Sequence, residues 1–194
     1  MDYRTKPLSR SSIRQLSKYI RKIFKLNESE PFPVLDILER VCIMFDGVDY
    51  IVVEDDDLPA DIFAWCYPKP EGGFMIEIKQ TVYDGACYHN NRAFLCFICH
   101  EICHVILFYL GYTPISTRML SKDEKIPAYC SVEWQAKALC GELTIPYEAT
   151  VGMKAKAIME KYQVTEASAK YRVKQDKSKK QTDKERQGGS NELN

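Results

Sequence analysis

Residues 91–110 constrain this chain most, because they form one long apolar run with ionisable side chains near its centre. The run ends just before Gly111, and glycine commonly closes a helix. The run is nearly long enough to cross a membrane, but His100, Glu101 and His104 would be costly in hydrocarbon. We therefore predict a central buried helix of a folded domain.

The two histidines of this run are spaced to share a metal ion. His100 and His104 differ by about 40° around an α-helix and lie about one turn apart, so both imidazoles can bind one Zn²⁺ ion. Glu101 lies about 100° from His100 and about 60° from His104, close enough to reach a water molecule at the metal without ligating the metal. The pattern predicts a zinc peptidase site with Glu101 as the catalytic base.

The same segment also fits three arrangements without a catalytic zinc. Two core histidines bonded to backbone groups would need no metal. Cys96 and Cys103 share a helix face with the histidines, so a structural zinc site with thiolate ligands can also form, although it leaves Glu101 without a purpose. Residues 96–100 also match the spacing of c-type haem attachment, but that chemistry needs export, and residues 1–14 contain no apolar signal peptide.

A catalytic zinc needs a third protein ligand and one open position. The only other histidine is His89, which precedes the motif in a turn-like segment. Glu133 lies in the first turn of a predicted helix that can pack beside the helix of His100 and His104. However, the helix dipole alone also favours a carboxylate at that position. Spacing alone leaves several downstream acids as candidates: Asp123, Glu124, Glu133, Glu142 and Glu148.

A second motif narrows this choice through a resemblance. Residues 133–136 read Glu-Trp-Gln-Ala and open a helix that ends in apolar residues and Pro146. Together with residues 100–104, this segment resembles the ImmA/IrrE family of bacterial metallopeptidases, over about residues 34–172. The resemblance implies that Glu133 is the third metal ligand.

The same resemblance implies a function. It indicates a zinc-dependent, site-specific endopeptidase that cleaves a protein partner, often a helix-turn-helix repressor in mobile elements or stress responses. The chain departs from the family pattern at Cys99 and Cys103, where the family usually has Ala and Gly, but both replacements are small and suit a helix. The main alternative is a non-catalytic regulatory or protein-interaction module with a structural zinc site.

The charge balance and the cysteine content limit which partners and which cellular compartment we expect. Lys+Arg and Asp+Glu both number 27, so nothing in the net charge favours nucleic acid or a membrane surface. A DNA-binding module with residues 165–172 as recognition helix is therefore disfavoured. Without a signal peptide we expect a cytoplasmic protein whose eight cysteines are thiols or ligands. The sequence does not indicate an oligomeric state.

We expect an α+β fold that is mostly helical and zincin-like. A small antiparallel sheet of about three strands should pack on the zinc-binding helix. Residues 1–172 are predicted to form a single domain, followed by a disordered polar tail at residues 173–194. The predicted parts of the domain are N-terminal helices (1–48), the sheet (49–80), the zinc helix (91–111), the third-ligand helix (131–143) and a C-terminal helical pair (153–172).

Overall fold

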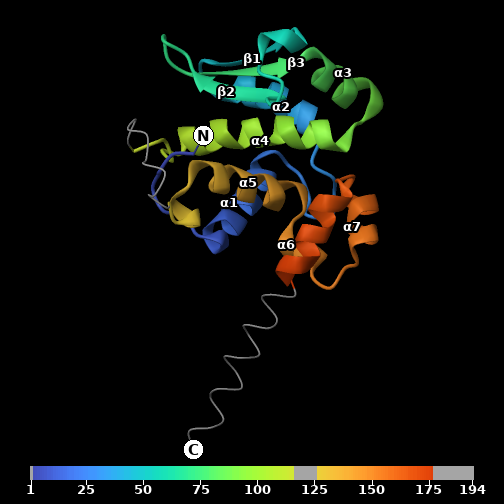
Figure 1. Ribbon diagram of the computed structural model, residues 1–194. Helices are drawn as coiled ribbons and strands as arrows, with labels where there is room; N and C mark the ends of the chain where they lie inside the picture. The colour runs from blue at the N-terminus through green and yellow to red at the C-terminus, as the bar shows by residue number, and fades with distance from the viewer. Residues whose placement is uncertain (1, 116–125, 177–194) are drawn as a thin grey trace, which may run out of the picture.

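Helix α4 (Arg92–Tyr109) runs through the middle of the computed structural model, which describes residues 2–115 and 126–176 (Figure 1). The Asn91 side chain caps its first turn by accepting two backbone N–H groups. At the other end Gly111 has a φ of 80° and closes the helix in a Schellman motif. Local sequence sets both ends of α4, and the closure at Gly111 is as predicted.

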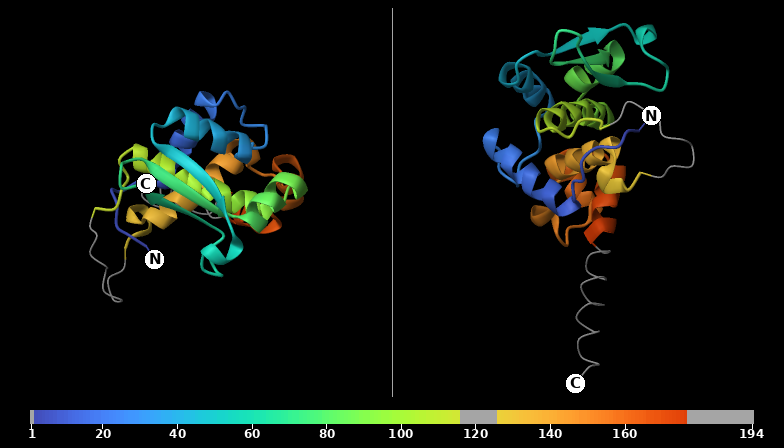
Figure 2. Two further views of the ribbon diagram at one scale, coloured as in Figure 1. Left: turned by 90° about the horizontal axis from the view of Figure 1, so that it is seen from above. Right: turned by 90° about the vertical axis from the view of Figure 1, so that its left-hand side faces the viewer.

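Two layers cover α4 on opposite sides, and the right-hand view of Figure 2 shows the same layering from the side. One layer contains a three-stranded sheet together with α2 (Val34–Met44) and α3 (Gln80–His89). The other contains α1 (Arg10–Ile23) and α5 (Val132–Thr144), which pack against each other. The mostly helical α+β fold predicted from the sequence is confirmed.

The apolar character of α4 is explained by this burial. By length and composition alone the helix could cross a membrane, with a mean hydropathy of 1.5, and it is the one such helix among the described residues. Every residue from Ile98 to Leu107 except His100 is buried. The layers on both sides therefore provide the apolar surroundings that the sequence of α4 requires.

The sheet is mixed, so the predicted all-antiparallel arrangement is wrong. Strand β1 (Val48–Val53) pairs in parallel with β3 (Phe74–Lys79), and β3 pairs antiparallel with β2 (Ala64–Pro68) on its other side. Residues 54–63, which include a short 3-10 helix at Asp55–Asp57, carry the chain from β1 to the far side of β3. As a result β2 is an edge strand, and it contacts α4.

A turn with two glycines joins β2 to β3. The two prolines and two glycines of residues 68–73 predict a turn at this place. Gly73 has a φ of 77°, and a Cβ atom placed on it would lie 2.1 Å from the Gly47 carbonyl oxygen. That carbonyl accepts a hydrogen bond from the Phe74 N–H. Only glycine permits this approach, which aligns the start of β3 with the start of β1.

Helix α1 is capped by Ser9, whose hydroxyl accepts the Ser12 N–H at 3.0 Å. One local prediction in the first half of the chain needs correction. The segment that ends at His89 is helix α3 and not a turn. Its amphipathic pattern is weak because small residues such as Gly85 form much of its buried side.

Helices α6 (Tyr147–Thr150) and α7 (Ala155–Tyr162) follow α5, and a further helix occupies residues 166–176. Thr165 caps this last helix by accepting the Ser168 N–H at 3.1 Å. The predicted C-terminal helical pair is therefore present, beside the α1 and α5 layer (Figure 1).

The boundary of the predicted disordered tail is wrong by a few residues. Residues 173–176 continue the last helix, because Asp176 is buried and accepts a hydrogen bond from the Gly152 N–H at 3.2 Å. The remainder of the predicted tail, residues 177–194, lies outside the described residues.

Candidate metal centre

Side chains from α4 and α5 converge on one point. The Nε2 atoms of His100 and His104 lie 3.1 Å apart. The Glu133 carboxylate faces both rings, with Oε2 at 3.3 Å from the His100 Nε2 and Oε1 at 3.3 Å from the His104 Nε2. These three residues form a group that can hold a metal ion, since their ligand atoms all lie within 4.8 Å of one another.

The start of α5 holds Glu133 in this position. Ser131 caps the helix by accepting the Trp134 N–H at 2.9 Å, and its hydroxyl donates to the Asp2 carboxylate at 2.6 Å. The other oxygen of Asp2 accepts the Glu133 N–H at 3.2 Å. The N-terminal segment thus ties down the first turn of α5, from which Glu133 reaches the histidines.

The group is closed on one side and open on the other. The exposed fraction of the side chain is 8% for His104, 18% for His100 and 34% for Glu133. Although burial opposes ionisation of Glu133, hydrogen bonds and positive charge from the two histidines hold its pKa well below the usual value. An ionised carboxylate and two imidazoles make a suitable ligand set for a divalent metal ion.

Packing orients the His104 ring. Its Nδ1 atom is buried and has no hydrogen-bond partner among the described residues. The ring packs against Phe108, with the two centroids 5.6 Å apart, while its Nε2 faces Glu133. Metal-binding histidines usually donate their other ring nitrogen to a protein group, so here the neighbouring side chains take over that orienting function.

Glu101 lies beside the group without belonging to it. Its carboxylate is buried, and Oε2 accepts a hydrogen bond from the Cys66 N–H of β2 at 3.0 Å. Burial raises the pKa of Glu101 to about 7, against the opposing effects of His100 and the Cys66 N–H. Near neutral pH this carboxyl group is therefore found in both protonation states, as a proton-transfer group requires.

The other candidate ligands have different surroundings. Glu142 is buried and forms ion pairs with Arg172 at 3.0 Å and Arg14 at 3.3 Å. Glu148 pairs with Lys18 on the surface, and the third histidine of the chain is exposed on α3. Two further candidates lie outside the described residues: Asp123 and Glu124.

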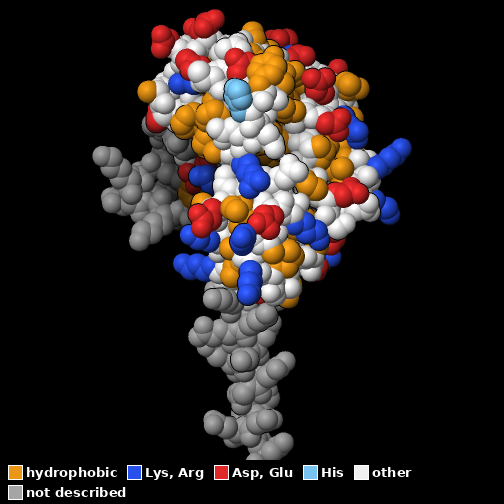
Figure 3. Space-filling view, turned by 90° about the vertical axis from the view of Figure 1, so that its right-hand side faces the viewer, with side chains coloured by type: hydrophobic (Ala, Val, Ile, Leu, Met, Phe, Trp, Pro, Cys, Tyr) orange, Lys and Arg blue, Asp and Glu red, His pale blue; other side chains and the backbone are white. Residues whose placement is uncertain are grey.

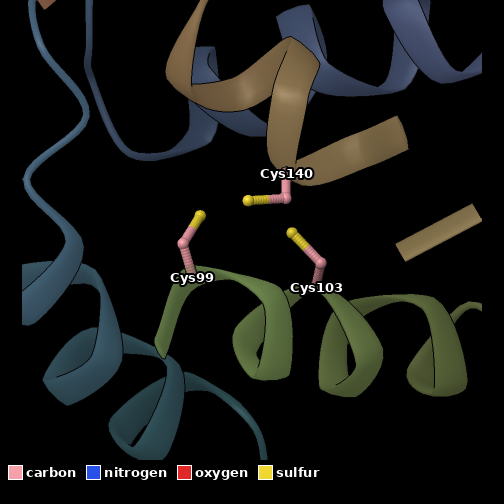
Figure 4. A group of neighbouring side chains, drawn as sticks. All are labelled: Cys99, Cys103 and Cys140. Carbon is pink, nitrogen blue, oxygen red and sulfur yellow. The ribbon is translucent and has the colours of Figure 1, made fainter. Parts of the chain in front are cut away.

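The structure separates the cysteines from the histidines. Cys99 and Cys103 point toward Cys140 of α5 and form a group of their own (Figure 4), so the alternative zinc site of Cys96, Cys103 and the histidines is not formed. Cys140 was not predicted from the sequence. Its spacing from Glu133 was the available signal, because residues seven apart lie on the same side of a helix.

No model of a known protein family matches this chain, and no curated protein matches it either. The resemblance to the ImmA/IrrE family therefore depends on the two motifs alone. Its ligand residues, His100, His104 and Glu133, are the residues that α4 and α5 bring together.

Proposed function

We propose that this chain is a zinc-dependent endopeptidase in which His100, His104 and Glu133 hold the ion. The convergence of these donors beside the buried Glu101 carboxylate carries the proposal. Two atoms bound to a tetrahedral zinc at about 2.0–2.1 Å lie roughly 3.3 Å apart. The observed separations of 3.1, 3.3 and 3.3 Å agree with that geometry. Three protein ligands also leave one position for solvent or substrate.

Glu101 is the general base in this proposal. A zinc ion at this position would polarise the scissile carbonyl and make a neighbouring water molecule more acidic. The Glu101 carboxylate takes a proton from that water molecule while the water oxygen bonds to the carbonyl carbon. It then gives the proton to the departing amine as the C–N bond breaks. The Cys66 N–H orients the carboxylate for both transfers through Oε2.

An extended polypeptide is the substrate class that fits beside this carboxylate. Among the described residues, β2 pairs with β3 on one side only, and its Cys66 N–H points to Glu101 and away from β3. The free edge of β2 therefore faces the candidate site, where a peptide can add as a further strand through backbone hydrogen bonds. Exposed Trp65 and the stacked pair Phe63 and Phe97 offer apolar contacts to its side chains.

A protein partner supplies this peptide in our proposal. The motif resemblance favours a helix-turn-helix repressor as substrate, in the cytoplasm. All eight cysteines are free thiols, as is usual in a reducing compartment. On the face shown in Figure 3, basic and acidic side chains are mixed, so that face is not the single-sign surface that nucleic acid requires.

The test combines metal content with hydrolysis. Wild-type protein loaded with zinc is incubated with a peptide library made from a proteome digest, and new peptide termini are identified by mass spectrometry. Glu101→Gln should keep the zinc at this site and lower the cleavage rate roughly 10²–10⁴-fold, because only the proton acceptor is lost. Glu160→Gln, on the exposed surface of α7, is the matched control and should cleave normally.

Two outcomes would reject the proposal. Cleavage of the same bonds by Glu101→Gln at the wild-type rate would show that Glu101 is not the base. Zinc content that is unaffected by His104→Ala and by Glu133→Ala would show that these residues do not hold the ion.

A further inference from the structure

A second group of metal-ligand side chains lies inside the same helix pair. Cys99 and Cys103 of α4 and Cys140 of α5 point toward one another (Figure 4), and their sulfur atoms all lie within 4.8 Å of one another. Their exposed fractions are 0%, 0% and 5%, so the group is enclosed by the core. The candidate peptidase site uses none of these side chains.

We propose that Cys99, Cys103 and Cys140 form a second, structural metal site for a thiophilic ion, with zinc as the natural occupant and Cys96 as fourth ligand. Sulfur atoms bound to tetrahedral zinc at about 2.3 Å lie roughly 3.8 Å apart. The sulfur atoms of Cys99, Cys103 and Cys140 lie within 4.8 Å of one another, so small movements of these side chains would bring them to that separation. Its members bind as thiolates and release their protons to solvent when the ion enters.

Cys96 lies next to this group. It precedes Cys99 by three residues, which places both on neighbouring positions of one helix face. The Cys140 Sγ lies 3.9 Å from the Cys96 carbonyl oxygen, so the two residues are in contact across the helix pair. The sequence Cys-x-x-Cys on α4 supplies two ligands at a spacing common in zinc sites, and Cys103 and Cys140 supply the others.

Packing alone explains small side chains in this interface but not the choice of thiols. Other small buried positions of the same core are alanines, such as Ala86, Ala136 and Ala138. In contrast, half of the eight cysteines of the chain meet at the contact between α4 and α5. A metal ion bound by all four cysteines explains why these thiols lie together.

The second site would help to position the first. Helices α4 and α5 run in opposite directions, because His104 contacts Glu133 while Cys99 lies against Cys140. An ion that joins Cys140 to α4 would fix how far α5 can slide along α4. Glu133 lies two turns from Cys140 on the same side of α5, so its distance to the histidines would be fixed as well.

A cavity provides a route for the ion. It has a volume of about 420 Å³ and lies between the N-terminal ends of α2 and α4 and the C-terminal helices. Cys96 lines this cavity and is only partly buried, whereas the other three thiols lie deeper. A metal ion can therefore meet Cys96 first and pass to the enclosed sulfur atoms from there.

The test examines the zinc ligands directly in the full chain. Protein loaded with zinc and freed of excess metal is measured for metal content and by X-ray absorption. Wild type should bind roughly two ions per chain and show zinc–sulfur scattering at about 2.3 Å. The double variant His100→Ala/His104→Ala should keep roughly one ion, held by sulfur alone.

The reciprocal variant is Cys99→Ala/Cys103→Ala/Cys140→Ala, which should lose the sulfur scattering and keep the ion at the histidines. Cys42→Ala/Cys87→Ala, which removes two thiols outside the group, is the matched control and should change neither ion. Should the triple variant fail to fold, the wild-type absorption spectrum still decides, because it needs no substitution.

The two proposals fail in different ways. Zinc bound only through nitrogen and oxygen in wild type would overturn the thiolate site and leave the peptidase proposal standing. Zinc bound only through sulfur would support the thiolate site and remove the basis of the peptidase proposal.

Discussion

The interface between α4 and α5 contains two similar triads that differ in access. Each triad takes two residues one turn apart on α4, Cys99 and Cys103 or His100 and His104, and one residue from α5. The α4 pairs differ by a single position, which turns the side chains by about 100°. The cysteine triad is enclosed by the core, whereas the histidine triad reaches solvent through the partly exposed side chains of His100 and Glu133.

In our two proposals, one pair of helices serves two purposes. A closed set of thiolates leaves no position for substrate and can only hold helices together. A set of two imidazoles and one carboxylate with an open side leaves a position where chemistry can occur. The difference depends on how far each ligand lies from the surface, since the helical framework is common to both.

The largest effect should come from removing the ligand that distinguishes the open triad. Glu133→Ala is expected to lower the zinc affinity of that site by at least ~100-fold, because losses of that order follow even from changes to groups that only orient ligands. Competition with a coloured chelator measures the affinity. Lys137→Ala removes the ion-pair partner of Glu133, 3.7 Å away, and serves as the control with little expected effect. Equal affinities for wild type and Glu133→Ala would remove this residue from the site.

A large effect on stability should come from the apolar packing that both triads share. Leu139 is fully buried on α5, next to Cys140. Leu139→Ala should lower the free energy of unfolding by about 2–5 kcal/mol, because it leaves a cavity, while folded protein keeps both ligand sets. Urea unfolding and metal content together measure this, with the exposed Ile43→Ala as control. Loss of metal from folded Leu139→Ala would show that packing and metal binding cannot be separated here.

The smallest effect should come from the cap of α5, and it should affect mainly the open triad. Ser131→Ala removes the hydrogen bonds to the Trp134 N–H and to Asp2, at a cost of about 1 kcal/mol in unfolding free energy. Because Glu133 lies in the first turn, zinc affinity at the histidines should fall modestly while the thiol group is unchanged. Ser131→Thr can keep the cap and should restore both values. If Ser131→Ala lowers metal binding at the thiols as much as it lowers metal binding at the histidines, the two triads are more tightly coupled than the separation of Glu133 and Cys140 along α5 suggests.

The sequence by itself determined the features that depend on neighbouring residues. The ends of α4 at Asn91 and Gly111, the one-turn spacing of His100 and His104, and the turn at residues 68–73 all follow from local backbone geometry. The weakly patterned α3 and the parallel pairing of β1 with β3 were not predictable in this way, because neighbouring elements stabilise them.

Only the tertiary structure brings together the distant groups that complete each triad. Spacing left several acids open and the motif resemblance favoured Glu133, but it is the packing of α5 on α4 that places Glu133 at the histidines and Cys140 at the other thiols. The same holds for Glu101, whose raised pKa comes from burial beneath β2 and from no residue beside it in sequence. Helical periodicity specifies the face on which a side chain lies, but the element that meets that face depends on how the whole core is packed.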